Sequence, residues 1–440
     1  MRTLDQWIDY IQTLHHRQID LSLERVHKVY LRLITDGAPF SVNTIAGTNG
    51  KGSTAEILSS IYCAAGVCVG KYSSPHLVRF NERYLINGSA VDDRQLLAAF
   101  EKIEHVRGDI PITFFEFGTL IAIELFRNNN VDIAIMEVGL GGRQDAVNIL
   151  DPDVAIVTSI SKDHTAWLGD TIDDISYEKI GIARANTPCI IGIEKPSKRM
   201  TDYCDEIKAN SLIVGQDFSY KLNEESNQKT DELAWQWHNS TVDYQDLPLP
   251  FGQADVQLSN ASLAIQAIEC MQNAHSVDFE TIRQGFIQAT LAARCQVVSK
   301  QPLIVLDVSH NVSSVQRLVD FVSKQIKDND TDSTQTKFNV VCGMLKDKEV
   351  AASLSLVSPM VDQWYLASIE HERGSDSEQL SKIVKHIESN SQIKTYSDVR
   401  TAYKEAIGNL KECDTLVVFG SFFIAGDILK FLSETDSLSN

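Results

Sequence analysis

The chain has 440 residues, of which 43% are hydrophobic and 22% are charged, and its formal net charge is −19. This length exceeds what one ordinary hydrophobic core holds, so we expect two domains, and the composition is typical of a folded globular chain. The acidic balance disfavours nonspecific binding to nucleic acid or to anionic membranes, because both are held by an excess of Lys and Arg. An anionic ligand therefore needs a local basic site.

The first residues show no basic segment followed by an apolar run, and no later stretch is long enough to cross a bilayer. We therefore expect a cytoplasmic protein. The eight cysteines form no Cys-x-x-Cys pair and fall mostly within apolar runs, which predicts reduced core thiols rather than disulfides or a zinc site.

The first strong motif is a glycine-rich turn, Gly47–Ser53, between an apolar strand-like run, Val42–Ala46, and an amphipathic helix. Such a turn lets successive backbone N–H groups converge on an anion, and the helix N-terminus and Lys51 add positive charge. The usual Walker pattern has Ser or Thr directly after the lysine, whereas here Gly52 intervenes before Ser53. We interpret the turn as a site for the phosphates of ATP.

Short β-branched runs then alternate with helical patterns, which indicates parallel sheets with crossover helices. The predicted strands are Val131–Glu137, Val154–Ile160, Cys189–Ile193, Ile304–Asp307, Asn339–Cys342 and Thr415–Phe419. We expect a P-loop-type α/β domain with a mainly parallel sheet over 1–290, and a smaller Rossmann-like α/β domain over 297–440.

Other segments carry weaker signals. The polar stretch Phe218–Pro250 is expected to be a hairpin excursion, and Ser259–Gln288 is expected to be helical. Asp328–Ser333 is predicted to be a surface loop, and Ser433–Asn440 a frayed tail.

Polar groups follow several predicted strands. Glu137 ends one strand before a glycine-rich turn, and His164 follows the next strand. Ligands gather at the carboxyl ends of strands in open α/β sheets, and a carboxylate there suits a phosphate-bridging Mg²⁺. A hydrogen-bonded structural histidine is the alternative for His164. Asp307–Asn311 repeats the pattern in the second half, where an N-capping turn is the alternative.

These segments together resemble one family, because they occur in the order seen in the folylpolyglutamate synthases, which are Mur-ligase-like ATP-dependent amide ligases. The motifs are Gly47–Ser53, Tyr72–Leu77, Glu137–Arg143, Asp163–Thr165, Glu178–Gly181 and Asp307–Asn311. Further matches are similar to the bacterial members that have both dihydrofolate synthase and folylpolyglutamate synthase activity: Phe115–Gly118, Cys342–Lys348 and Gly420–Phe422.

The resemblance implies a set of ATP and metal contacts. Nucleotide contacts are implied for Thr48, Asn49, Gly50, Lys51, Gly52, Ser53, Asn260, Arg294 and Asp307. Metal contacts are implied for Ser53, Ser74, Glu137, His164 and a carbamylated Lys179. Lys51, His164 and Lys179 would be the groups closest to the chemistry, with ATP and Mg²⁺ as cofactors and a monovalent cation such as K⁺ as a further candidate. Without the modification, Lys179 would be an ordinary helix lysine.

The resemblance also implies a dihydropteroate site. Its lining would comprise Ile19, Asp20, Leu21, Thr113, Phe114, Phe115, Glu116, Gln144, Asp145 and Ala146. Phe114 and Phe115 fit equally well as core aromatics. One departure concerns the linker, because Ala292-Ala293 precede Arg294 where the family usually has Pro-Gly.

The implied activity is ATP-dependent addition of L-glutamate to dihydropteroate and to reduced folates through an acyl phosphate. Three alternatives stay open. The chain could have folylpolyglutamate synthase activity alone, it could be a Mur-type peptidoglycan ligase, or it could be a nucleotide-binding protein without ligase activity. The short stretch before Gly47 disfavours the second, because such ligases usually need an N-terminal UDP-binding domain.

Overall fold

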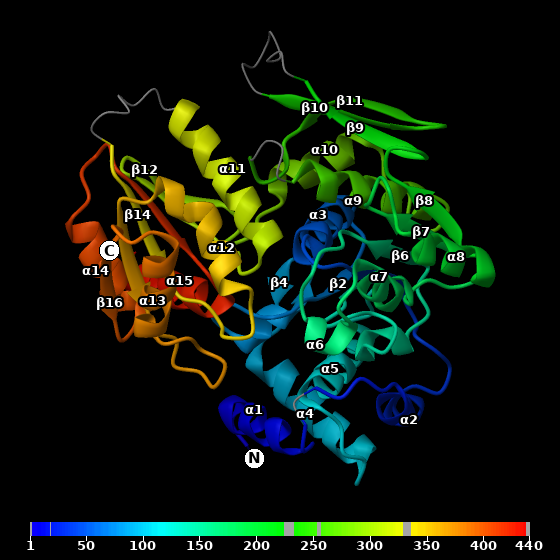
Figure 1. Cartoon of the computed structure of the whole chain (residues 1–440). Coiled ribbons are helices and arrows are strands. Elements are labelled where there is room, and N and C mark those ends of the chain that lie inside the picture. The colour runs from blue at the N-terminus through cyan, green and yellow to red at the C-terminus, as the bar shows by residue number, and fades with distance from the viewer. Residues whose placement is uncertain (1, 18, 224–232, 253–256, 329–335, 437–440) are drawn as a thin grey trace. The chain divides into compact units, whose positions relative to one another are not determined.

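The computed structural model describes residues 2–17, 19–223, 233–252, 257–328 and 336–436 (Figure 1). The chain divides into two compact units, one made of residues 1–76 and 80–290 and the other of residues 77–79 and 291–440. Leu77–Arg79 thus belongs to the second unit although the chain on both sides of it belongs to the first.

The first unit is built on a mainly parallel sheet, whose described strands follow the order β4-β3-β2-β5-β1-β6-β7-β8. Only β3 and β4 run antiparallel to their neighbours. The strands are β1 (Ser41–Ala46), β2 (Val69–Tyr72), β3 (Tyr84–Ile86), β4 (Ser89–Ala90), β5 (Ile133–Glu137), β6 (Val154–Val157), β7 (Pro188–Ile191) and β8 (Asn210–Ile213).

Helices cover both faces of this sheet, as its buried apolar strands require. One face packs against α5 (Phe114–Asn128), and the other against α3 (Lys51–Ala64) and α9 (Leu258–Met271). The other helices of the unit are α1 (Leu4–Thr13), α2 (Glu24–Leu33), α4 (Asp93–Arg107), α6 (Thr165–Leu168), α7 (Ile172–Ile180), α8 (Lys198–Ile207) and α10 (Phe279–Gln288), with short 3-10 turns η1 (Phe80–Arg83), η2 (Ala146–Ile149) and η3 (Pro250–Gly252). Residues 272–278 separate α9 from α10, so the helical stretch expected over Ser259–Gln288 is two helices.

The expected hairpin over Phe218–Pro250 is instead a three-stranded antiparallel sheet, in the order β11-β10-β9. Its strands are β9 (Phe218–Leu222), β10 (Ala234–Asn239) and β11 (Asp243–Pro248). Trp235 and Trp237 on β10 are fully buried in the same core cluster as α9 and α10. The sequence did not predict this packing, because many residues of the three strands are polar and partly exposed.

The second unit has a six-stranded sheet in the order β12-β13-β17-β14-β15-β16, of which only the edge strand β12 is antiparallel. The strands are β12 (Gln296–Lys300), β13 (Leu303–Leu306), β14 (Phe338–Cys342), β15 (Gln363–Ala367), β16 (Gln392–Tyr396) and β17 (Thr415–Phe419). The helices are α11 (Val312–Asp328), α12 (Val350–Val357), α13 (Ser377–Ile387), α14 (Val399–Gly408) and α15 (Phe422–Asp436), with the turn η4 (Ser358–Met360). The predicted fold class is confirmed in both units.

Two sequence predictions fall partly beyond the described residues. Asp328 is the last residue of α11, and the rest of the loop predicted over 328–333 lies outside them. The tail predicted over 433–440 is wrong for its first half, since α15 extends to Asp436, and 437–440 lie outside the described residues. In the part of the chain that is described, no helix is long and apolar enough to cross a membrane.

Candidate active site

The glycine-rich turn connects β1 to α3, at the carboxyl edge of the first sheet. Gly47 has φ 150° and Gly50 has φ 89°, a conformation that side chains rarely adopt. A Cβ atom at Gly47 would collide with the Thr158 hydroxyl, and one at Gly50 would collide with the amide of Asn260. Both positions therefore require a residue without a side chain. Asn260, which is predicted to contact the nucleotide, lies directly against the turn at Gly50.

Residues after β6 hold this turn in place. The Thr48 amide donates to the carbonyl of Ser159 at 2.7 Å, and the Asn49 amide donates to the Ser159 hydroxyl at 3.0 Å. The Thr158 hydroxyl donates to the Asn49 carbonyl at 2.7 Å, and Thr48 and Ser161 exchange two further hydrogen bonds. Sequence reasoning missed these braces, although three hydroxyl residues within four positions after a buried strand were a visible signal.

Two lysine side chains meet at one backbone carbonyl. Nζ of Lys51 donates to the Gly47 carbonyl at 3.0 Å, and Nζ of Lys179, on α7, donates to the same oxygen at 2.9 Å. Lys179 is 5% exposed. Burial, reinforced by the charge of Lys51, lowers the pKa of Lys179 from 10.5 to about 7, so a large fraction of this amine is neutral near neutral pH.

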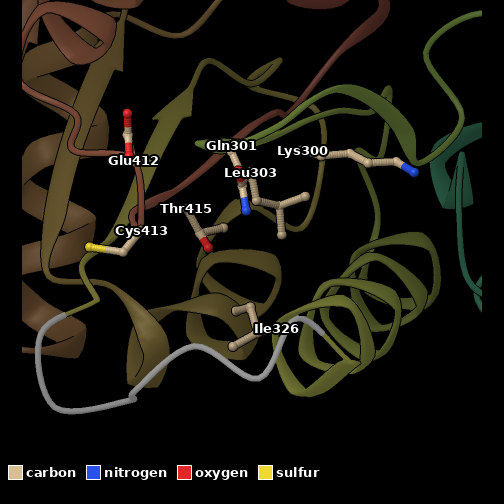
Figure 2. Close-up of a pocket in the computed structure, with 7 residues that line it drawn as sticks. All are labelled: Lys300, Gln301, Leu303, Ile326, Glu412, Cys413 and Thr415. Carbon is tan, nitrogen blue, oxygen red and sulfur yellow. The ribbon is translucent and has the colours of Figure 1, made fainter.

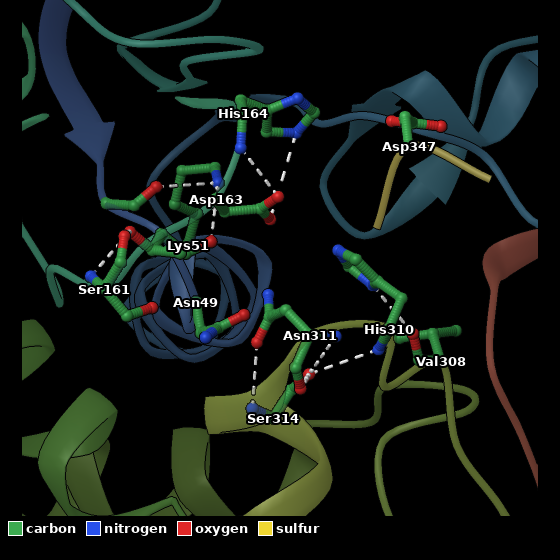
Figure 3. Close-up of polar contacts among 12 residues, drawn as sticks. Asn49, Lys51, Ser161, Asp163, His164, Val308, His310, Asn311, Ser314 and Asp347 are labelled. Carbon is green, nitrogen blue, oxygen red and sulfur yellow. Dashed lines mark hydrogen bonds and ion pairs between the residues drawn. The ribbon is translucent and has the colours of Figure 1, made fainter. Parts of the chain in front are cut away.

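The predicted strand-end groups lie where parallel strands finish. Glu137 is the last residue of β5 and is 5% exposed, and its Oε2 accepts a hydrogen bond of 3.2 Å from the Ser74 amide. His164 precedes α6 in a left-handed conformation, φ 52°. Its ring Nε2 lies 3.9 Å from a carboxylate oxygen of Asp163, and its amide donates to the other oxygen at 2.8 Å (Figure 3).

The arrangement of these groups bears on the predicted metal site. Among the described residues, no three His, Cys, Asp or Glu side chains are grouped closely enough to enclose an ion. Ser53 is buried in the first turn of α3, and Glu137 supplies a carboxylate. A hydroxyl and a carboxylate are oxygen donors of the kind that hard divalent cations take, with water and substrate phosphates completing the shell.

The segment after Glu137 is bound tightly to α7. Arg143 pairs with Glu178 at 2.7 Å, and its amide donates to the Glu178 carbonyl, also at 2.7 Å. The turn after Glu137 and the end of α7 lie so close together that a Cβ atom at Gly142 or at Gly181 would collide with the opposite segment. Since Lys179 follows Glu178 directly, this contact sets where the Lys179 amine lies.

Asp145 is also occupied by backbone contacts. Its carboxylate accepts hydrogen bonds from the amides of Gly139 at 3.1 Å, Leu140 at 2.9 Å and Val147 at 3.0 Å. Burial raises the pKa of Asp145 to about 6 against the opposing effect of these donors. Gln144 is half-buried beside it, and Ala146 is buried at the start of η2. The side chain therefore shapes the turn that follows Glu137.

The other residues predicted to line the pterin site lie near the N-terminus of α5. Thr113 caps this helix and forms a capping box with Glu116. The half-buried ring of Phe115 packs against Tyr72, with 5.9 Å between ring centroids, and the guanidinium of Arg83 lies 5.4 Å from the centre of Phe114. The half-buried segment 19–21 joins this region through Asp20.

In the second unit, Asp307 follows β13 and is 4% exposed. Its carboxylate accepts hydrogen bonds of 2.6 Å from the amides of Cys295 and Ser309. Arg294 stacks over Phe422, with its guanidinium carbon 4.9 Å from the ring centre. The residues flanking Arg294 are both left-handed, with φ 53° at Ala293 and 46° at Cys295. The hydrogen bond from the Cys295 amide to the Asp307 carboxylate thus holds residues 293–295 in this conformation.

The turn after Asp307 is ordered by local contacts. His310 places Nδ1 2.9 Å from the Val308 carbonyl, and Asn311 Oδ1 accepts from the Ser314 amide at 3.0 Å (Figure 3). These contacts agree with the capping alternative for Asn311.

A cavity of about 240 Å³ lies elsewhere in the second unit (Figure 2). Leu303 and Thr415, the first residues of β13 and β17, contribute to its lining together with Lys300 and Glu412. It therefore lies at the amino ends of the strands, opposite the edge where Asp307 is placed, and no predicted site residue lines it.

Two family models match the chain. The Mur ligase middle domain matches residues 45–268, and the Mur ligase glutamate ligase domain matches residues 293–422. The dihydrofolate synthase/folylpolyglutamate synthase of Escherichia coli K12 is 38% identical over 431 residues, which cover 98% of this chain and 95% of that protein.

Solved structures give the same picture. Escherichia coli FolC in complex with DHPP and ADP is 37% identical with a TM-score of 0.90, covering 99% of both chains. The bifunctional folylpolyglutamate synthase/dihydrofolate synthase of Yersinia pestis, complexed with AMPPNP and a Mn ion, is 37% identical with a TM-score of 0.87, covering 98% of both chains.

Proposed function

The chain belongs to the Mur ligase family and, within it, to the dihydrofolate synthase/folylpolyglutamate synthases, and we propose that it joins L-glutamate to dihydropteroate and to reduced folates at the expense of ATP. The observation that carries the ATP-dependent part of this proposal is the glycine-rich turn at Gly47–Lys51, where the backbone lacks side chains at Gly47 and Gly50 and the ammonium of Lys51 lies at the Gly47 carbonyl. Such a cradle suits the phosphates of a nucleotide.

The proposed reaction solves a chemical problem, because a carboxylate is a poor electrophile and does not form an amide at neutral pH without activation. A carboxylate oxygen of the pteroate or folate attacks the γ-phosphorus of ATP, and ADP leaves. The amine of L-glutamate then attacks the acyl carbon of the acyl phosphate, loses a proton, and expels inorganic phosphate to leave an amide. Positioning and electrostatics are the main contributions of the protein.

We assign the residues as follows. The backbone amides of Gly50, Lys51 and Gly52 and the ammonium of Lys51 would hold the phosphates, while Thr48 and Asn49 fix the turn through Ser159 and Asn260 lies against it. Ser53, Ser74, Glu137 and His164 would hold a divalent ion, which when bound neutralises charge on the transferring phosphoryl group. Mg²⁺ is the proposed ion, with K⁺ as a candidate monovalent ion, and the contributions of Arg294 and Asp307 stay predictions.

Lys179 is proposed to carry a carbamate. This modification forms when a neutral amine attacks CO₂, creating an N–C bond and releasing a proton, so it requires an amine that is not protonated. The depressed pKa of Lys179, about 7, meets that requirement. A Lys179→Ala variant is expected to lose activity and to regain part of it when a short carboxylic acid is supplied. Failure of this rescue, together with a mass spectrum of the intact protein free of the modification, would contradict the carbamate.

The dihydropteroate end of the proposed site involves Phe115 and Asp145. A pterin is flat, so an aromatic face suits it, and Asp145, whose buried carboxylate accepts from three backbone amides, would shape the turn beside the ring. Replacing either residue is expected to impair the use of dihydropteroate more than that of tetrahydrofolate. Because Asp145 also holds the turn after Glu137, Asp145→Asn is expected to lower turnover with both substrates as well.

One assay tests the whole proposal. Release of ADP is measured with dihydropteroate or tetrahydrofolate, each with and without L-glutamate. Glutamate-dependent release with both is expected. Release with tetrahydrofolate alone would leave only folylpolyglutamate synthase activity, and no glutamate-dependent release would favour a non-catalytic nucleotide-binding protein. The proposed setting is a monomer in the cytoplasm, and light scattering of the purified protein tests the first part.

A further inference from the structure

Arg25, the second residue of α2, connects two segments that are far apart in the sequence. Its Nη1 donates to Asp20 Oδ2 at 3.3 Å, and its Nη2 donates to the Asp20 carbonyl at 3.1 Å. The same Nη2 donates to Glu116 Oε1 at 3.2 Å, across 91 positions of the chain. One guanidinium therefore ties the segment before α2 to the first turn of α5.

The contact with Glu116 matters because that carboxylate is 3% exposed. Its Oε2 accepts from the Thr113 amide at 2.6 Å and so completes the capping box of α5, while its Oε1 faces Arg25. A buried carboxylate is costly unless it is paired and hydrogen-bonded. Removal of Arg25 would thus disturb the helix N-terminus that presents Phe114 and Phe115.

The contact with Asp20 holds the segment that precedes α2. The side chain of Asp20 is 22% exposed, and His15 Nε2 lies 3.5 Å from the carboxylate oxygen that Arg25 also contacts. The segment 19–21 belongs to no helix or strand, so these side-chain contacts define its position.

We infer that Arg25 is a positioning residue for the pterin end of the substrate. It holds the segment 19–21 and the start of α5, between which the flat ring of dihydropteroate would bind, at a set separation. This inference rests on the proposed function, which assigns Phe115 of α5 to the substrate, and on the family resemblance, which implies the segment 19–21 as a second lining segment. Arg25 acts through its contacts with Asp20 and Glu116. Replacing Arg25 is therefore expected to leave the glycine-rich turn and the Lys179 amine unchanged.

The test compares Arg25→Ala with Arg25→Lys and with the control Arg32→Ala. Arg32 lies on the same helix, and its guanidinium also bridges to a distant segment, donating to the carbonyls of Val106 and Arg107. For each variant, KM for dihydropteroate, ATP and L-glutamate, kcat, and the melting temperature are measured.

Arg25→Ala is expected to raise KM for dihydropteroate by about tenfold or more, while kcat and the KM values of ATP and L-glutamate change less than about threefold. Arg25→Lys should recover part of the loss because one charged contact can form, and Arg32→Ala should leave every KM near the wild-type value. If Arg25→Ala does not fold, Asp20→Asn, which weakens the other side of the same contact, should show the selective rise in KM.

Two results would overturn the inference. One is an unchanged KM for dihydropteroate in a folded Arg25→Ala variant, and the other is a uniform rise of all three KM values that follows the drop in melting temperature, since a merely structural role predicts the latter. Wild-type protein that turns over tetrahydrofolate but never dihydropteroate would instead refute the proposed function, so the two failures are distinguishable.

Discussion

Replacing Lys179 with methionine is expected to stabilise the chain while abolishing ligation. The amine is buried beside the charge of Lys51, which lowers its pKa from 10.5 to about 7. That difference corresponds to a cost of about 5 kcal/mol for keeping Lys179 charged in the folded state, as an upper bound. Methionine has a similar length and no charge, and it sacrifices one hydrogen bond to the Gly47 carbonyl, worth about 1 kcal/mol.

The expected gain depends on pH in a defined direction. A base whose pKa is lowered by folding binds fewer protons in the folded state, so the stability of the wild type rises as the pH increases from the folded value toward the unfolded one. Below about pH 7 Lys179 is charged in both the folded and the unfolded state, so the free energy of unfolding of the wild type is reduced by the full cost of the buried charge. The advantage of Lys179→Met should therefore be greatest at or below pH 7 and should shrink by about 2 kcal/mol between pH 7 and pH 9.

Urea unfolding of both proteins from pH 6 to pH 9, in buffer free of CO₂, measures this difference. Lys71→Met is the matched control, because Lys71 is equally buried but is paired with Glu56. Its removal leaves Glu56 without that cation, so the control variant should be less stable than the wild type. A constant stability difference between wild type and Lys179→Met across this pH range would refute the reasoning.

Three further changes test the site. Glu137→Gln should lower turnover by about 100-fold or more with the melting temperature nearly unchanged, since it removes charge but little volume; near-normal ADP release would contradict the metal role. Gly50→Ala should abolish nucleotide binding measured by calorimetry, because the left-handed φ and the contact with Asn260 both oppose a Cβ atom. Ala293→Gly should raise the free energy of unfolding by about 0.5 kcal/mol, the balance between relief of its left-handed strain and the greater freedom of glycine when unfolded; a loss of stability would show that the strain is absent.

Ala293 is the position where this sequence departs from the usual Pro-Gly of the family. The family usually has Pro-Gly before the arginine, and the structure places Ala293 at the left-handed φ that a glycine adopts without cost. The alanine is therefore strained at this position of the linker.

The sequence by itself determined the elements whose signals are local. The turn at Gly47–Ser53, the buried strands and Glu137 at a strand end follow from residue type and spacing, because a helix, a strand or a glycine turn depends on neighbours within a few positions. The order of the motifs was sufficient to identify the family, and the matches of both Mur ligase domains confirm it.

Only the tertiary structure decided the chemistry of individual groups. Burial and the charge of Lys51 lower the pKa of Lys179, whose amine donates to a carbonyl 132 positions away, and Arg25 meets Glu116 across 91 positions. Asp145, predicted as a pterin contact, uses its carboxylate on three backbone amides. Burial, charge neighbours and hydrogen-bond partners are properties of the folded chain, because segments with no local relation in the sequence become adjacent only when the sheets and helices pack.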